Sequence, residues 1–537
     1  MANRRKSGDK ILRTSKFFRI FKMKKAILNI LLITSILLSF ACRSAPENKA
    51  NEKVLRIATS YKIQNLDPLK SAFYFLIEFN VAETPLVLGE DAKLKPALLE
   101  SYEQIDALNW RLMLRPNVKF QNGRILTAEK LAAAMNRQLN QSPSAKAIIS
   151  DASVKAIGER ELVLTTKNPD PNVPAALADE DVFPVYDVEA MEAAGSDREK
   201  LANCACYTGA YKIVSLNDRE MRLTAFADYR QGTPALDGVI VKFIGEPQAR
   251  ILAVQSGETD IALYPPTEGK RILANRQDAF FITAEDGRGG PRLLFNTRRP
   301  PFDEAATRRA VSLGINYESL ANDVMDKVFA PADGFYAPLN SWAIQNQKTD
   351  VETAEKLLDE AGWIKNADGL RSKNNQPLEG VFLTYPQQPD WTTLATAIQA
   401  QLRKIGFNLK IRQVEDINQE LKNPANWNIA INSPGILTTG GAPDPYLREY
   451  LSTGGVTNYG GVSDAELDRL INELSRTFAA EKRIEMLRRI QEIVIAEKAF
   501  EARPVLTKTR AIVGKNYRNY KPSAVLRHIT FETKPDE

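Results

Sequence analysis

The stretch WRLMLRPNVKFQNGRILTAEKLAAAMNRQ, residues 110–138, places a strand, a turn and a helix in a fixed order. Every second residue from Trp110 to Leu114 is large and apolar, which is the pattern of a half-buried strand. The turn dipeptide Asn122-Gly123 ends the strand region. Thr127 is expected to cap the helix that follows, because its hydroxyl can accept a hydrogen bond from a free N–H of the first turn.

This stretch also resembles the signature of the family 5 extracytoplasmic solute-binding proteins, the peptide- and nickel-binding components of ABC importers. The resemblance runs from about Val54 to Tyr520. It implies an α/β, two-lobe periplasmic-binding-protein fold (class II, Venus-flytrap) with an extra subdomain in the first lobe. Further segments that resemble the family's motifs are LDP at 66–68, SGETDIAL at 256–263, LLFNTRRPPFDEAATRRAV at 293–311 and AEKLLDEAGW at 354–363.

The resemblance sets expected domain bounds. The first lobe is expected over residues 54–288, with an inserted subdomain at about 84–205. The second lobe is expected over 289–502, and residues 503–537 are expected to return to the first lobe.

Helix signals are strong inside the expected second lobe. Thr349-x-x-Glu352 predicts a capping box for a helix over 350–361, and Gly362 fits the position just after its end. A stretch over 464–497 predicts one or two amphipathic helices. The residues expected to face inward there are Leu467, Leu470, Ile471 and Leu474.

The N-terminal region predicts export. Residues 23–42 read MKKAILNILLITSILLSFAC, with two lysines followed by an apolar segment too short to be a good membrane span. Met23 is the expected true start, and residues 1–41 comprise an upstream extension and a signal peptide. Cys42 is expected to be lipidated and followed by a linker to residue 53, which predicts a periplasmic or cell-surface protein anchored to a bacterial membrane. Ordinary secretion and an uncleaved anchor are the alternatives.

The charge balance gives no sign of a nucleic-acid partner. The chain holds 72 Lys and Arg against 66 Asp and Glu, a net charge of +6. Residues 1–41 contain 10 basic residues and 1 acidic residue, so the rest of the chain carries 62 against 65. The excess of positive charge therefore belongs to the upstream extension and signal peptide together and does not indicate a basic binding surface.

The residue types that carry catalysis are sparse. The chain has one histidine, His528, which excludes HExxH and multi-histidine metal sites, and GxSxG does not occur. We therefore expect a binding protein, not an enzyme, with no cofactor and no metal. Cys204-Ala205-Cys206 leaves three possibilities open: two semi-buried thiols, a disulfide, or a soft-metal site.

The segment 427–460 departs from the family it resembles. Peptide-binding relatives carry an Asp that pairs with the ligand's ammonium group, and alignment on Asp444-Pro445 places Gly441 there. The loop 384–391 also lacks the Arg that dipeptide-binding relatives use for a ligand carboxylate. Loss of such a charge-assisted contact costs about 1.5–3 kcal/mol, so a free-amine dipeptide is not expected to bind in the standard way. Either Asp444 substitutes for the missing Asp, or it only begins a turn.

The expected function is capture of a peptide, or another small polar solute, between two lobes, and delivery to an ABC permease and its ATPase. The protein is expected to be a monomer that meets the membrane through its lipid anchor. A solute-sensing lipoprotein without transport and a cleft hydrolase that uses an acid such as Asp444 are the alternatives. The expected ligand-binding residues are Tyr61, Asn296, Tyr385, Gln388, Ser433, Gly435 and Asp444.

Overall fold

The computed structural model describes residues 53–537 except 64, 71–72, 150 and 434–440. Residues Lys53–Glu537 form one compact unit. The predicted signal peptide, Cys42 and Gly435 lie outside the described residues. Among the described residues, every helix is too short or too polar to span a bilayer.

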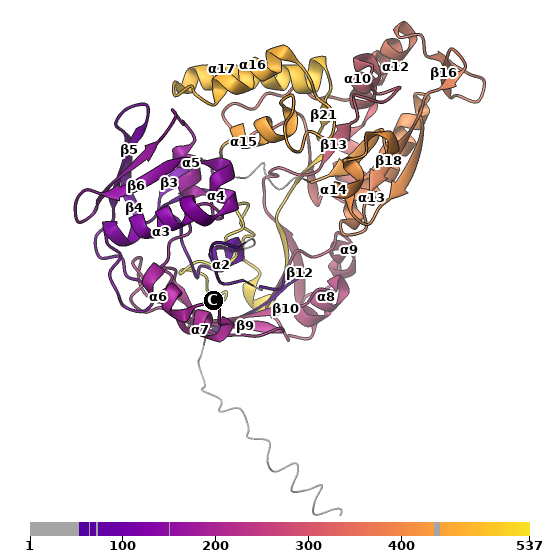
Figure 1. The fold of residues 1–537 in the computed structure, drawn as a ribbon. Helices are drawn as coiled ribbons and strands as arrows, with labels where there is room; N and C mark the ends of the chain where they lie inside the picture. The colour runs from indigo at the N-terminus through magenta and orange to yellow at the C-terminus, as the bar shows by residue number, and fades with distance from the viewer. Residues whose placement is uncertain (1–52, 64, 71–72, 150, 434–440) are drawn as a thin grey trace, which may run out of the picture. The chain divides into compact units, whose positions relative to one another are not determined.

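A seven-stranded sheet forms the first of two central sheets (Figure 1). Its middle strand β1 runs parallel to both neighbours, β10 and β11. Leu55, Ile57 and Ala58 of β1 are fully buried, as a central strand covered on both faces requires. The strands in sheet order are β12 (Ala279–Thr283), β23 (Arg510–Gly514), β11 (Ile261–Leu263), β1 (Val54–Thr59), β10 (Gly238–Phe243), β9 (Glu220–Ala225) and β8 (Tyr211–Leu216).

A five-stranded sheet is the second central sheet. Strand β18 pairs in parallel with β19 and β20, whereas β13 runs antiparallel to β20 and β21. The strands in order are β19 (Asn408–Gln413), β18 (Glu379–Thr384), β20 (Ile429–Asn432), β13 (Arg292–Phe295) and β21 (Glu501–Ala502).

The chain passes between the two sheets twice. It leaves the seven-stranded sheet after β12, enters the five-stranded sheet at β13, and returns through β21 to β23. In Figure 1 the yellow C-terminal segment runs back to the region of β10 and β12. The domain bounds predicted from the sequence stay a prediction.

The opening stretch of the sequence folds as predicted. Its strand is β5 (Asn109–Leu114), in a four-stranded sheet with β4 (Leu99–Gln104), β7 (Glu161–Thr166) and β6 (Ala152–Ala156). Gly123 has a φ of +86°, a turn conformation that glycine adopts readily. The Thr127 hydroxyl accepts from the N–H of Lys130 at 3.4 Å and so caps α3 (Ala128–Gln141).

The predicted capping box at Thr349 is wrong by one residue. Asp350 is the N-cap of α12 (Val351–Glu360), and its carboxylate accepts from the N–H of Thr353 at 3.1 Å. The Thr349 hydroxyl instead donates to the Ile315 carbonyl oxygen at 2.7 Å. A carboxylate is the stronger acceptor at a helix N-terminus, and the tertiary contact to Ile315 takes the hydroxyl. Gly362 follows the helix end with a φ of +85°, as predicted.

The amphipathic stretch 464–497 forms α16 (Ala465–Leu474) and α17 (Ala480–Gln491). The four residues predicted to face inward are all buried in one cluster. The other helices are α2 (Tyr74–Glu78), α4 (Pro143–Ile148), α5 (Val173–Ala178), α6 (Val188–Ala194), α7 (Arg198–Asn203), α8 (Pro247–Gln255), α9 (Gly269–Leu273), α10 (Ala305–Gly314), α11 (Tyr317–Ser319), α13 (Pro389–Lys404), α14 (Ile417–Leu421) and α15 (Asp444–Tyr446). The short strands are β2 (Leu86–Leu88), β3 (Leu94–Pro96), β14 (Phe329–Pro331), β15 (Ile364–Lys365), β16 (Arg371–Lys373), β17 (Gln376–Pro377) and β22 (Val505–Thr507).

Candidate functional site

The carboxyl ends of parallel strands are the usual ligand-binding edge of an α/β sheet. In the five-stranded sheet, β18 and β20 are parallel neighbours, so the residues that follow them stand at the same edge. Tyr385 follows β18 and is half-buried, while Ser433 follows β20 and is exposed. Burial raises the pKa of Tyr385, so its phenol is a hydrogen-bond donor at neutral pH. The fold thus brings two predicted ligand residues to one edge.

The corresponding edge of the seven-stranded sheet carries Tyr61, two residues after β1. Tyr61 as a whole residue is 45% exposed. It stacks on Phe75 at a centroid distance of 5.3 Å and meets Tyr264 edge-on at 5.2 Å. These contacts hold the ring in place while the residue stays exposed, so it is able to meet a ligand.

Asn296, another predicted ligand residue, lies in the interior and is fully buried. Its side-chain amide donates to the carbonyl oxygens of Pro424 and Trp427, at 2.7 and 2.9 Å. Its side-chain oxygen accepts from the N–H of Arg298 at 3.2 Å. These bonds hold the segment before β20 against the end of β13. A ligand contact by Asn296 stays a prediction.

Asp444 begins α15 and is only 2% exposed. Its carboxylate forms an ion pair with Arg483 at 2.7 Å. The same Nη2 of Arg483 also donates to the Asn172 side-chain oxygen at 3.2 Å. The Asp444 carboxylate is therefore already paired within the protein. Its proposed role as an anchor for a ligand's ammonium group stays a prediction.

Gln388 lies at the N-terminus of α13, where its carbonyl accepts from the N–H of Trp391 at 3.0 Å. The next polar residue, Asp390, reaches across to the seven-stranded sheet. Its carboxylate pairs with Arg510 of β23 at 2.8 Å and accepts from the Thr267 hydroxyl at 2.8 Å. This contact joins the elements of the two central sheets directly.

An acidic turn beside α2 is the feature that the sequence analysis missed. Burial raises the pKa of Asp179 to about 7, that of Glu180 to about 8 and that of Asp181 to about 6. Burial, together with the charges of Glu78 and Asp181, raises the pKa of Tyr74 to about 12. Acidic and aromatic groups therefore lie within electrostatic range of one another.

The same acidic turn is linked to the C-terminal segment. Glu180 pairs with Arg527 at 2.9 Å. The Tyr264 hydroxyl lies 2.9 Å from the His528 ring nitrogen and 3.4 Å from the Glu78 carboxylate. His528 is 1% exposed, so it serves the packing of this region. The available sequence signal was three consecutive acids between apolar runs, which is weak in a chain with 66 acidic residues.

Comparison with known proteins places this arrangement in a family. The family model described as "Bacterial extracellular solute-binding proteins, family 5 Middle" matches residues 93–458. The chain belongs to this family. Its members are extracellular, two-lobe proteins, and the family 5 protein described here is a substrate-binding component of the ABC-importer class.

Individual relatives of the family 5 protein are distant but cover most of its length. The nickel-binding protein NikA of Staphylococcus aureus is 24% identical over 434 residues, which is 80% of this chain and 84% of the relative. Di/tripeptide-binding protein 2 of Pseudomonas aeruginosa is 26% identical over 419 residues, or 71% and 75% of the two chains. The crystal structure of NikA from Brucella suis in complex with Fe(III)-EDTA has a TM-score of 0.80 at 19% identity, and covers 90% of this chain and 100% of that one.

The two remaining cysteines of the family 5 protein form a disulfide. Cys204 and Cys206 are joined, with Cα atoms 5.2 Å apart. Cys206 is fully buried, and the next residue, Tyr207, donates its hydroxyl to the Leu66 carbonyl oxygen at 2.5 Å. Of the three possibilities left open by the sequence, the structure has the disulfide. Among the described residues, no three His, Cys, Asp or Glu side chains gather as a metal site.

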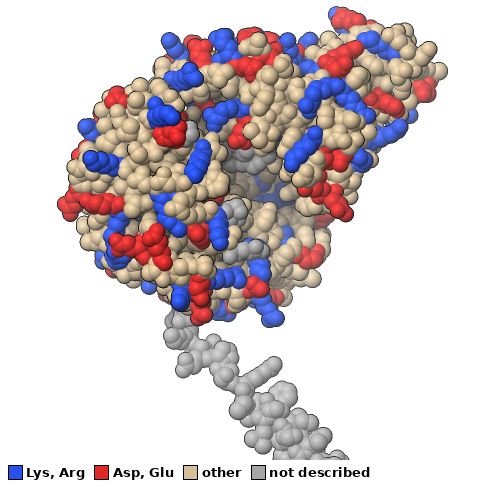
Figure 2. Space-filling view, viewed as in Figure 1, with Lys and Arg blue, Asp and Glu red and all other residues tan. Residues whose placement is uncertain are grey.

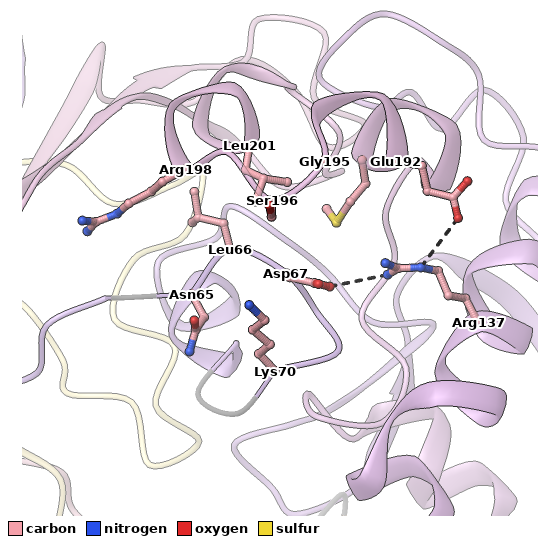
Figure 3. Close-up of a pocket in the computed structure, with 11 residues that line it drawn as sticks. Asn65, Leu66, Asp67, Lys70, Arg137, Glu192, Gly195, Ser196, Arg198 and Leu201 are labelled. Atoms are coloured by element: carbon pink, nitrogen blue, oxygen red, sulfur yellow. Dashed lines mark hydrogen bonds and ion pairs between the residues drawn. The ribbon is translucent and has the colours of Figure 1, made fainter.

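A separate cavity of about 360 Å³ lies beside α6 and α7 (Figure 3). Arg137 crosses its wall and pairs with Asp67 at 3.5 Å and with Glu192 at 3.9 Å. Figure 3 shows Lys70 on the facing loop. None of the predicted ligand residues lines this cavity.

On the face shown in Figure 2, acidic and basic side chains are mixed over the surface.

Proposed function

We propose that this family 5 protein captures a peptide or peptide-like solute and delivers it to a membrane permease. The observation that carries the proposal is the pair of sheet edges just described. Tyr61 stands at the edge of one central sheet, and Tyr385 and Ser433 stand at the edge of the other. Exposed aromatic rings and hydroxyl groups suit a solute with both apolar and hydrogen-bonding parts.

The chain crosses between the two central sheets twice, and these crossings can act as a hinge for ligand capture. A ligand that contacts both edges stabilises the closed arrangement by its differential affinity for that state. The ion pair between Asp390 and Arg510 favours the same arrangement, because it joins α13 to β23. Capture and release then require no covalent step. Tyr385 supplies a donor and Tyr61 an apolar face.

We further propose that Cys42 is lipidated and holds the protein at a bacterial membrane. The motif that supports this is the apolar segment ending in Ala41-Cys42. The test is the mass of the N-terminal peptide of the protein from its own host. A diacylglyceryl mass on Cys42 is expected, and an unmodified Cys42 in a secreted protein would contradict the proposal. A matched Cys42→Ala variant is expected to leave the membrane fraction.

Native mass spectrometry of the protein from its own host tests the ligand. A ladder of added masses that match short peptides is the expected result. Replacing Tyr61 with alanine is expected to weaken capture, whereas Ile364→Ala, which removes an exposed side chain from β15, should leave it unchanged. A protein that emerges without any added mass under conditions that preserve complexes would contradict solute capture.

A small metal chelate is the second candidate ligand, favoured by the similarity to a nickel-binding protein and to a NikA solved in complex with Fe(III)-EDTA. With one histidine in the whole chain, a nickel complex would have to bring its own nitrogen ligands. The same experiment separates the two candidates. A single discrete added mass with a nickel isotope pattern supports the chelate and contradicts the peptide.

A further inference from the structure

Two arginines stand at the ligand-facing edge of the five-stranded sheet, and neither was singled out by the sequence. Arg292 is the first residue of β13 and pairs in register with Asn432, the last residue of β20. On the other side of β13, Leu293 pairs with Ala502. The next position outward along that ladder therefore places Arg292 beside Arg503. Both lie at the edge where Tyr385 and Ser433 stand.

The two guanidinium groups share one carboxylate. Glu501 lies 3.1 Å from an Arg292 nitrogen and 2.5 Å from an Arg503 nitrogen, and all three side chains are fully buried. The Tyr446 hydroxyl donates to Glu501 at 2.9 Å and accepts from both arginines at 3.1 Å. Burial raises the pKa of Tyr446 to about 12, so this hydroxyl is neutral. Two positive charges thus face one negative charge.

Several donors in this group are unused. The Nη2 of Arg292, and the Nε and Nη1 of Arg503, have no hydrogen-bond acceptor among the described residues. The Tyr336 hydroxyl, whose pKa burial raises and which lies within electrostatic range of Arg503, is equally without a partner there. Buried polar groups nearly always have partners, and a buried unpaired charge is strongly unfavourable.

Aromatic rings compensate only part of this charge. The Arg503 guanidinium carbon lies 4.7 Å from the Phe335 ring centroid, and that of Arg292 lies 4.6 Å from the Tyr450 ring centroid. Such contacts favour a cation over the ring face. The ring faces do not accept hydrogen bonds from the unpartnered N–H groups, because these groups point outward in the plane of each guanidinium. An acceptor with negative charge would satisfy both the donors and the charge balance.

We propose that Arg292 and Arg503 receive a small anionic group, either a carboxylate of the captured solute or a free inorganic anion of similar size. The planar guanidinium fork matches a carboxylate, and its unpartnered N–H groups can each donate to a small anion. The solute arm rests on the proposed function. Loop 384–391 has no arginine at this edge. Arg292 of β13 and Arg503, which follows β21, would supply the guanidinium groups there instead.

Bromide crystallography of the full chain, purified in detergent, tests the proposal. Crystals are grown with sodium bromide as the salt, once from protein of the native host and once from a heterologous host in minimal medium. An anomalous peak within hydrogen-bond distance of Arg292 or Arg503 is expected in the second crystal. If solute density replaces the peak in the first crystal, the solute is the source; if bromide remains, an inorganic anion is. Arginines that contact only water or protein in both crystals would overturn the proposal.

An Arg503→Gln variant gives an independent readout. The unfolding temperature of the wild-type chain is expected to rise as sodium bromide is added, and R503Q should lose this rise. Arg489→Gln, on the exposed side of α17, is the matched control and should keep it. An unchanged bromide effect in R503Q overturns the proposal, and the crystals decide the matter if that variant fails to fold. Native mass spectrometry reports solute capture separately, so an empty protein with a bromide peak would refute only the proposed function.

Discussion

Replacing Asp390 with asparagine removes the charge from a contact between the two central sheets. Asp390 lies in the first turn of α13, the helix beside β18 and β19 of the five-stranded sheet, and Arg510 belongs to β23 of the seven-stranded sheet. Their side chains are 13% and 17% exposed, so water screens the pair only weakly. Burial already lowers the pKa of Arg510, a sign that its charge depends on the partner. Asparagine has the same shape and can still accept from Thr267.

The expected loss follows from the geometry of the pair. A hydrogen bond to a charged group contributes about 1.5–3 kcal/mol, and removing one partner of a fully buried pair costs roughly 3–5 kcal/mol. Because both side chains keep some exposure, we expect a loss of about 2 kcal/mol, near the lower range. Since 1.4 kcal/mol is a factor of ten, this corresponds to roughly thirtyfold in the equilibrium constant.

A double-mutant cycle in urea measures this coupling. The full chain is unfolded as wild type, Asp390→Asn, Arg510→Gln and the double variant, and the coupling free energy is expected to be about 2 kcal/mol. Asp278→Asn, at an exposed pair with Arg276, is the control and should change stability little. A coupling within about 0.5 kcal/mol of zero, the range of additive mutations, would show that the pair does not hold the two sheets together.

The acidic turn gives a pH prediction. Burial raises the pKa of Asp179 to about 7 in the folded protein, against about 3.9 for a free Asp. The stability linked to this group is therefore complete below about pH 4 and is lost as the pH rises to about 7. Unfolding in urea between pH 4 and 8 should therefore show stability falling with rising pH, less steeply in Asp179→Asn than in Asp228→Asn, an exposed control; equal slopes would contradict the burial argument. Reduction of the disulfide should lower stability by about 1–2 kcal/mol, because so short a loop restricts the unfolded chain little. Thermal unfolding with and without dithiothreitol checks this, and a Cys204→Ala, Cys206→Ala double variant should not respond to the reductant. Gly209→Ala should destabilise by a few kcal/mol, since its added Cβ would lie 2.2 Å from the Asn80 backbone oxygen, whereas Gly245→Ala has open space around it; similar melting temperatures for the two variants would refute the clash.

Local patterns predicted the elements that depend on neighbours in the chain. Alternation from Trp110 to Leu114 gave β5, and Thr127 gave the cap of α3, because both depend on residues a few positions apart. The error at Thr349 shows the limit of such reasoning. A hydroxyl beside a helix can cap it, but a carbonyl oxygen 34 residues away in the sequence took that hydrogen bond instead.

The candidate site depended far more on tertiary structure. The order of motifs established the family resemblance, and it suggested Tyr61, Tyr385 and Ser433 as edge residues. It also suggested Asn296 and Asp444, whose side chains have partners inside the protein. Sequence alone could not reveal those partners, since Arg483 lies 39 residues from Asp444 and reaches it only through the packing of α17 against the start of α15.

The sequence by itself determined the family and local elements such as β5 and α3, because these depend on local periodicity and on the order of short motifs. Tertiary structure alone decided which charges meet. Arg292 and Arg503 are 211 positions apart by their numbers, and they become neighbours through the pairing of β13 with β21. Burial removes these charged side chains from water, so that their charges must be balanced by neighbouring groups. Burial depends on the packed fold, which no local sequence pattern specifies.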